Sequence, residues 1–278
     1  MLRTRIVTAL ALLAGLLPAL FLLPPLVWAW LIAVVAGLAA WEWGGFMRLG
    51  GSGRAALGAG CFLLCAAAIL GFPEALGGEG WSLAVAWELG RWLYLPALIF
   101  WVFALPLWLR QRWPLPGFLG GLAVGAVVLL PTCLALVQLR QLGPAALLAT
   151  MAVVWAADVA AYFAGRAFGR RKLAPNISPG KTWAGVWGAV AGVLVYGFAA
   201  AGLLPEALQR GGLPFFALAL VALTALSVVG DLFESLLKRQ AGIKDSSNLL
   251  PGHGGILDRI DSQTSTLPFV ALLWLFLS

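Results

Sequence analysis

The sequence predicts an all-α polytopic membrane protein with about nine transmembrane helices. Its composition, the spacing of its apolar stretches and the placement of its basic residues all support this. Of 278 residues, 62% are apolar and 10% are charged, whereas a soluble protein carries about 25% charged residues. Such a chain, with a mean hydropathy of +0.96, cannot cover a water-facing globule. The composition therefore excludes a soluble enzyme, a disordered chain and a disulfide-stapled secreted domain.

Apolar stretches of about twenty residues are typical of membrane-spanning helices. The first follows two arginines, as in a signal peptide, but it is too long and is expected to be an uncleaved span. Glycines at every fourth position predict ridges for close helix packing: Gly117, Gly121 and Gly125, then Gly188 and Gly192. The predicted spans are about 6–23, 26–47, 55–73, 92–109, 117–139, 144–165, 184–204, 213–237 and 264–278.

The basic residues give these spans an orientation. With nine spans, all but three of the 18 Lys and Arg residues lie on the side of the N-terminus, the exceptions being Arg91, Arg140 and Arg210. Cytoplasmic loops carry such an excess of basic residues, so the N-terminus is expected in the cytoplasm. The net charge of +7 then reflects orientation, and no nucleic-acid partner is expected.

Polar residues divide the chain into two regions. Residues 1–140 are predicted to be hydrophobic helices, and residues 141–278 carry the two most polar cytoplasmic loops, 166–183 and 238–263. Five acidic residues are expected to be solvated or interfacial: Glu42, Glu74, Glu79, Glu88 and Glu206. The other six lie in the second region near its cytoplasmic face: Asp158, Asp231, Glu234, Asp245, Asp258 and Asp261.

Two predicted helices carry polar residues at helical spacing. A carboxylate deep in a membrane helix costs roughly 2.5–3.5 kcal/mol on insertion scales. Asp158 is therefore expected to be either functional or paired with another group. It shares a face with Tyr162 and Arg166, which allows either an internal ion pair with Arg166 or a carboxylate that lines a site. The other helix carries a polar stripe on an otherwise apolar surface. Such a stripe could line a cavity, contact a partner helix or form a structural network. It comprises Asp231, Glu234, Ser235 and Lys238.

A glycine-rich turn around His253 follows this stripe. Beyond it, Asp258 and Asp261 are three residues apart and can share one side of a helical turn. Together with Asp231 they would form an all-oxygen site, which suits Mg²⁺ better than zinc. Cations interleaved with such carboxylates are typical of a polyphosphate site; those nearby are Lys238, Arg239, Lys244 and Arg259. A solvated charged loop is the alternative.

The other polar loop contains ISPGKTWAG, residues 177–185. Its Gly180-Lys181-Thr182 matches the end of a Walker A loop, but that motif needs a glycine at the position of Pro175, so a P-loop is not predicted. A phosphate contact by Lys181 remains compatible with this loop. His253 could bind phosphate, transfer a proton or simply brace its own loop.

The stretch 235–261, SLLKRQAGIKDSSNLLPGHGGILDRID, resembles the signature of the phosphatidate cytidylyltransferases, or CDP-diacylglycerol synthases. The upstream GDLFES, and AAYFAGRAFGRRKLAPNISPGKTW with Asp158 before it, are also similar to that family, so the resemblance covers about 155–263. That family usually has SPKKTWEG where this chain has Gly180 and Ala184, so one phosphate contact and one acid are missing. The signature positions are filled by Ser235, Lys238, Arg239, Lys244, Asp245, His253, Gly254, Gly255, Asp258, Arg259 and Asp261.

The resemblance implies that CTP and phosphatidate are converted to CDP-diacylglycerol and pyrophosphate at a bacterial-type cytoplasmic (inner) membrane. Asp231, Asp258 and Asp261 would hold Mg²⁺, with a second cation allowed, and Asp158 would be a fourth acid of the site. Lys181, Lys238, Arg239 and Arg259 would bind phosphates. The remaining substrate-binding positions would be Ser235, Lys244, His253, Gly254 and Gly255. Membrane lipids are the expected surroundings, and a homodimer is left open.

Three alternatives remain at this point. A CTP-dependent lipid kinase acting on a polyprenol-type alcohol could use a similar apparatus. A transporter of ions or phosphate would also carry buried charges, but these would follow a path through several spans rather than gather at one face. A catalytically inactive homologue is made less remote by Gly180 and Ala184.

Overall fold

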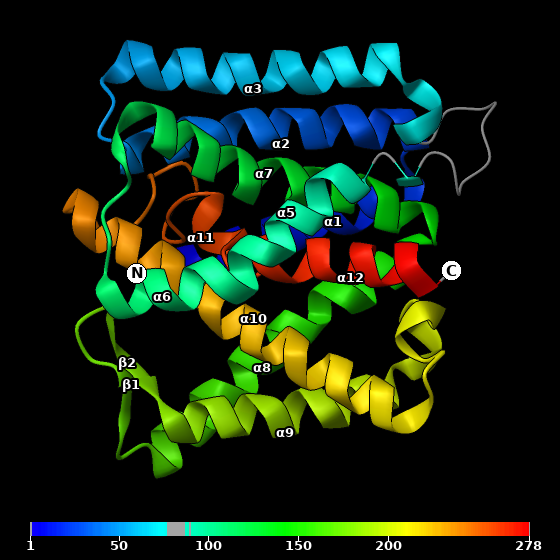
Figure 1. Ribbon diagram of the computed structural model, residues 1–278, viewed down its shortest axis with the longest axis vertical. Coiled ribbons are helices and arrows are strands. Elements are labelled where there is room, and N and C mark those ends of the chain that lie inside the picture. Colours follow the sequence, from blue (N-terminus) through cyan, green and yellow to red (C-terminus); the bar gives the residue numbers. More distant parts are fainter. Residues whose placement is uncertain (1, 77–86, 89, 278) are drawn as a thin grey trace.

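The computed structural model describes residues 2–76, 87–88 and 90–277 and is built almost entirely of helices (Figure 1). Each predicted span coincides with helix, and six helical stretches of the described residues are long and apolar enough to cross a membrane. These are α2 (Pro25–Phe46), α3 (Gly51–Gly71), Arg91–Gln111, α7 (Gly117–Gln141), α8 (Pro144–Phe168) and α10 (Gly212–Ala241). Arg91–Gln111 consists of α5 (Arg91–Ile99), the π-helical η2 (Phe100–Ala104) and α6 (Leu105–Gln111).

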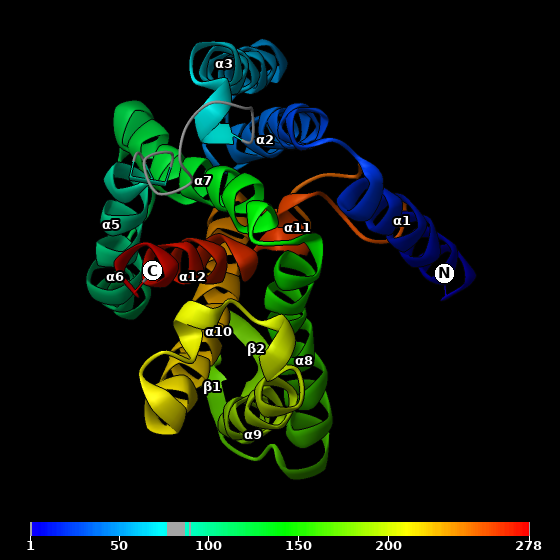
Figure 2. The ribbon, with the colours of Figure 1, turned by 90° about the vertical axis from the view of Figure 1, so that its right-hand side faces the viewer.

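Three further apolar helices of the described residues are shorter than these six. Each of the nine predicted spans thus has a helix, but a count of nine membrane crossings stays a prediction. The three shorter helices lie in α1 (Leu2–Leu22), α9 (Trp183–Ala199) and α12 (Gln263–Leu277). Short 3-10 turns occupy η1 (Pro73–Leu76), η3 (Ala201–Leu203) and η4 (Glu206–Leu208), and the four-residue α11 (Leu257–Ile260) precedes α12. Figure 2 shows α1 leaning away from the other helices.

Both polar loops lie at the same end of the helix bundle, on the left of Figure 1. The first loop contains an antiparallel hairpin of β1 (Lys172–Ala174) and β2 (Ser178–Thr182), which the sequence did not predict. In the second, α10 continues to Ala241, so the free loop begins later than expected. At this end the Gln240 amide donates hydrogen bonds to the carbonyls of Arg112 and Trp113, at 3.0 and 2.9 Å.

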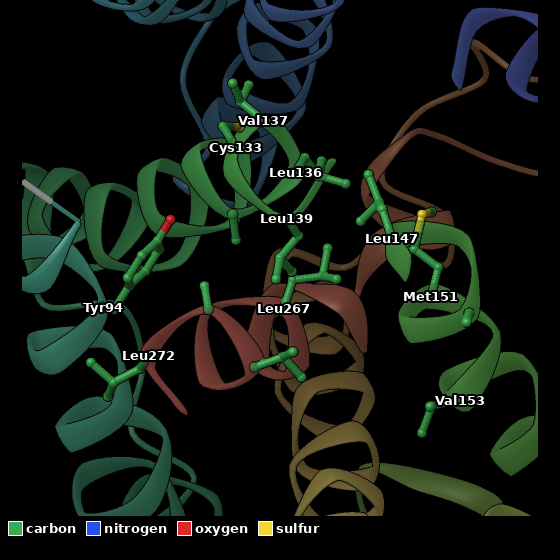
Figure 3. Packing of buried hydrophobic residues seen from close by; sticks show 14 of the residues in the cluster. Tyr94, Cys133, Leu136, Val137, Leu139, Leu147, Met151, Val153, Leu267 and Leu272 are labelled. Carbon is green, nitrogen blue, oxygen red and sulfur yellow. The ribbon is translucent and has the colours of Figure 1, made fainter. Parts of the chain in front are cut away.

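The apolar core centres on α7 and α12, with α5 and α8 on either side (Figure 3). Leu139 of α7 and Leu267 of α12 are fully buried and face each other. On the outside, by contrast, large apolar side chains are strongly exposed, among them Trp92 and Leu119. In water such exposure is unfavourable at about 25 cal/mol per Å² of apolar surface, so these faces fit a lipid environment.

Small residues let helices approach where the glycine spacing predicted it. A Cβ on Gly188 or Gly192 of α9 would collide with Ala164 or Ala160 of α8, which confirms the predicted packing ridge. In the other ridge, Gly125 lies against Trp43 of α2, and Gly121 against Met47, which directly follows α2. Gly117 has open space around it, so only part of that ridge packs as predicted.

Candidate active site

The hairpin fixes the position of Lys181. Lys172 of β1 pairs with Thr182 of β2, and Thr182 is also the N-cap of α9, where its hydroxyl accepts a hydrogen bond from the Gly185 amide at 3.1 Å. Threonine is a favoured N-cap because its oxygen satisfies an otherwise unpaired amide of the first turn. Since Thr182 is buried, its neighbour Lys181 has a defined place at the start of α9.

Lys181 forms an ion pair with Asp231 of α10. Its Nζ lies 2.5 Å from Oδ2 of Asp231, and the two side chains are 24% and 28% exposed. Ser235, one turn further along α10, donates a hydrogen bond to the other oxygen of Asp231 at 3.2 Å. The pair is therefore held from two sides yet stays accessible to a ligand.

A cavity of about 350 Å³ opens beside this pair, between α8, β2, α9 and α10. Figure 1 shows the hairpin at the end of α8 and α9, and in the end-on view of Figure 2 it projects between α8, α9 and α10. Asp158 and Tyr162 of α8 line the cavity together with Lys181 and Asp231, and alanine, valine and leucine side chains line much of the rest. Charged groups and apolar helix surfaces thus share one cavity.

The alternative of an ion pair between Asp158 and Arg166 is not observed. Arg166 donates a hydrogen bond to the Tyr162 hydroxyl at 3.1 Å, and the ion pairs of the described residues do not join it to Asp158. Arg166 also lines the cavity. Asp158 therefore lines the cavity, and its role as a carboxylate of the site stays a prediction.

Asp261 lies between α11 and α12, close to Asp231 and Asp158. Burial, followed by the negative charge of Asp231, raises its pKa to about 7. One of its oxygens accepts a hydrogen bond from the Ser262 amide at 2.7 Å. The structure thus brings three of the predicted acids and Lys181 into one electrostatic neighbourhood.

Asp258 is held in a separate network. Its Oδ1 lies 2.6 Å from Lys238 Nζ, and its Oδ2 accepts hydrogen bonds from the Ser246 amide, the Ser246 hydroxyl and the Gly255 amide, each at 2.8 Å. Burial alone would raise the pKa of Asp258, but these donors outweigh it and lower the pKa. Glu234 lies 3.4 Å from the same lysine. The predicted polar stripe on α10 thus serves two networks, Asp231 to Lys181 and Lys238 to Asp258.

Among the residues that the structure describes, no three Asp, Glu, His or Cys side chains lie together closely enough to hold a metal ion. Asp231 and Asp261 are neighbours, whereas both oxygens of Asp258 are occupied by the network above. The expected grouping of Asp231, Asp258 and Asp261 around one ion is therefore not preassembled, and their role as ligands stays a prediction.

The remaining signature residues shape or border the loop. Gly254 has a positive φ of 82°, which favours glycine, and a Cβ there would press on the Asp258 carboxylate. The His253 amide donates to the Leu250 carbonyl at 2.8 Å, so its backbone braces the turn, and its side chain is half-buried. Among the signature cations, Arg239, Lys244 and Arg259 are exposed.

Glu42 was wrongly expected to be solvated or interfacial. It lies on α2 with 0% exposure, and its carboxylate binds the loop that follows α10. An acid in an apolar helix was the available signal, but its partners lie more than 200 residues away along the chain.

Of the other four acids in that group, Glu88 and Glu206 are exposed as expected. Glu79 and the side chain of Glu74 lie outside the described residues.

A comparison with known families shows which family the chain belongs to. The sequence model of the cytidylyltransferase family matches residues 3–277. The chain belongs to the cytidylyltransferase family. The resemblance over 155–263 therefore extends to the N-terminal helices of this cytidylyltransferase, including the segment that carries Glu42.

Individual relatives agree with the family assignment. A phosphatidate cytidylyltransferase of Pseudomonas aeruginosa is 43% identical over 285 residues, covering 99% of this chain and 97% of that protein. One from Haemophilus influenzae is 37% identical and covers 99% of both chains. One from Brucella suis is 50% identical over 125 residues, 45% of this chain and 44% of that protein. The kinase and transporter alternatives receive no support from these comparisons.

Proposed function

We propose that this membrane protein transfers the cytidylyl group of CTP to phosphatidate, forming CDP-diacylglycerol and pyrophosphate. The observation that carries the proposal is the cavity in which Lys181 and Asp231 meet apolar helix surfaces. The two relatives that match the chain over its whole length carry the name of this activity. A phosphate on an acyl-chain lipid needs such a boundary, because its two ends require opposite surroundings.

The reaction asks for charge neutralisation and alignment rather than for a strong base. A phosphate oxygen of phosphatidate attacks the α-phosphorus of CTP; the new P–O bond forms as the bond from the α-phosphorus to the bridging oxygen breaks, and pyrophosphate leaves. The attacking phosphate is already ionised near neutral pH. In-line positioning and stabilisation of the developing charge therefore supply most of the rate.

We assign Lys181 as the main phosphate ligand, on the basis of its place in the cavity. In the structure its ammonium neutralises Asp231, and both side chains are about one quarter exposed. A phosphate that enters the cavity can take over the ammonium, because charge-assisted contacts to phosphate are strong. Arg166 lines the same cavity, while Arg239 and Arg259 are exposed at the same end and can meet the remaining phosphates of CTP.

Release of Asp231 from Lys181 would leave two neighbouring carboxylates, Asp231 and Asp261, with an excess of negative charge. Such a pair of hard oxygen donors fits Mg²⁺, which usually binds through one or two carboxylates together with substrate phosphates and water. When bound there, Mg²⁺ would withdraw charge from the phosphates. Asp158 could support a second cation. Asp258 would reach the ion only by leaving its contacts with Lys238 and the loop.

The sidedness of the reaction follows from the basic residues. The end of the bundle that carries both polar loops holds most of the Lys and Arg residues, so we place it in the cytoplasm, with the N-terminus, where CTP is available. We further propose that the three shorter helices also cross the bilayer, which makes nine spans. The bacterial relatives favour an inner membrane.

The test uses purified protein in detergent with phosphatidate, Mg²⁺ and CTP labelled either at the α-phosphate or at the γ-phosphate. Cytidylyl transfer places the α-label in the lipid and releases the γ-label as pyrophosphate. A lipid kinase, supplied with a polyprenol-type alcohol in place of phosphatidate, would put the γ-label into the lipid instead. Absence of α-labelled lipid under every metal condition would overturn the proposal.

A further inference from the structure

We infer that Glu42 is a positioning residue that holds the active-site loop from the opposite half of the chain. Four donors, all from residues of the segment 246–257, lie within hydrogen-bonding distance of its carboxylate; the single hydrogen of the Ser246 hydroxyl is shared between Glu42 and Asp258. Oε1 accepts from the Ser247 hydroxyl at 2.6 Å and the Ile256 amide at 2.9 Å. Oε2 accepts from the Ser246 hydroxyl at 3.0 Å and the Leu257 amide at 2.8 Å.

These contacts tie together the two ends of the glycine-rich turn. Ser246 and Ser247 precede the turn, and Ile256 and Leu257 follow it, so a single carboxylate closes the loop. A buried carboxylate without partners is very unfavourable, and Glu42 has 0% exposure. The side chain therefore keeps its place only while the loop supplies these donors, and the loop in turn depends on Glu42.

The loop passes the effect to the acids of the site. The Gly255 amide donates to Asp258, and a Cβ at Gly255 would collide with both Glu42 and Ser246. Asp258 in turn binds Lys238. The next turn leads through α11 to Asp261, so the position of Glu42 determines where both signature aspartates lie.

Glu42 contributes little to the attachment of its own helix. Helix α2 is anchored by buried apolar residues such as Trp28, Ala36 and Trp43, and the Trp43 indole donates a hydrogen bond to the Gly121 carbonyl at 3.0 Å. The helix should thus stay in place when Glu42 changes, while the loop loosens. This inference rests on the proposed function for its effect on catalysis, but the contact itself can be tested without substrate.

The decisive variant is Glu42→Gln, which has the same shape but turns one acceptor into a donor. In either orientation of the glutamine side chain, its NH₂ group faces the backbone N–H of Ile256 or of Leu257. Two donors then face each other, and a backbone N–H cannot rotate away. We expect hydrogen–deuterium exchange of the substrate-free protein to become at least tenfold faster in segment 246–257. We also expect kcat to fall at least tenfold, with less than a threefold change in KM for CTP.

Glu206→Gln is the matched control, because Glu206 is exposed and belongs to η4, which precedes α10 at the opposite end of the bundle from the loop (Figure 1); it should change neither measurement. Unchanged exchange in Glu42→Gln would overturn the inferred contact. Faster exchange with an unchanged kcat would overturn the positioning role. If Glu42→Gln does not fold, Ser247→Ala removes one donor alone and should give a smaller change of the same kind; no change in that variant would also overturn the inference.

If the parent protein forms no cytidine-labelled lipid, the proposed function fails, and the exchange comparison still decides whether Glu42 holds the loop.

Discussion

Replacing Lys181 with alanine removes the cation that pairs with Asp231 across the cavity between β2 and α10. In the structure Nζ and Oδ2 are 2.5 Å apart, a short charge-assisted contact that a substrate phosphate can take over. A hydrogen bond to a charged group contributes about 1.5–3 kcal/mol, which corresponds to roughly one to two decades in binding or rate. We therefore expect kcat/KM to fall about 10- to 100-fold.

The hairpin offers no second lysine beside Lys181, because Gly180 stands at the position where the family resemblance predicts one. Gly180 is exposed, and a Cβ there would meet nothing within 4 Å. Gly180→Lys should therefore be tolerated. It should lower KM for CTP if the hairpin faces the nucleotide, or for phosphatidate if it faces the lipid. The same change should restore part of the activity of Lys181→Ala.

The assay is steady-state formation of cytidine-labelled lipid in detergent, with each substrate varied in turn. Lys172→Ala is the matched control, since Lys172 is an exposed lysine on the facing strand of the same hairpin. It should retain activity within about twofold, because an exposed charge contributes little. Full activity of Lys181→Ala would refute the reasoning, and the hairpin would then be structural.

Three further predictions concern the metal, the topology and pH. Asp258→Asn and Asp261→Asn should each lower turnover by orders of magnitude, and EDTA should do the same to the parent; near-normal turnover in both variants would exclude the proposed metal site. In a cysteine-free background, single cysteines at 172 and 245 should react with a membrane-impermeant reagent from one side and one at 210 from the other; labelling of 172 and 245 from opposite sides would contradict the shared site. Because its donors lower the pKa of Asp258, its stabilisation is complete above the unfolded pKa of about 4 and is lost as pH falls through the lower folded value. Asp258→Asn should therefore flatten the fall of the thermal midpoint below about pH 4; an unchanged slope would contradict this.

The sequence by itself determined the helical class and the position of the helices, and it singled out the segments that we propose to carry the chemistry. Hydropathy along the chain is enough to locate the helices, because each span must satisfy its own backbone hydrogen-bonding groups in the bilayer. The basic residues fixed which turns share a side, and the structure places the two polar loops together at one end. The signature from Ser235 to Asp261 also located the acids, because its residue types are specific in their spacing.

The tertiary structure alone decided which of these groups meet. Asp258 and Asp261 are three residues apart, yet one binds Lys238 and the loop while the other lies near Asp231. This division depends on how α10 is rotated against the hairpin and on how the loop closes, and neither is visible in a pattern of spacing. The hairpin itself escaped prediction because its strands have only three and five residues.

Glu42 shows the same limit most clearly. The sequence marks it as an acid in an apolar helix, but it cannot name donors that lie 204 to 215 residues further along the chain. Local hydropathy and charge describe each helix separately, whereas the pairing of a carboxylate with a distant loop depends on which helices pack together and at what rotation. The packing of the whole bundle decides which helices meet and how they are rotated, because side chains from both halves of the chain fill the same buried space.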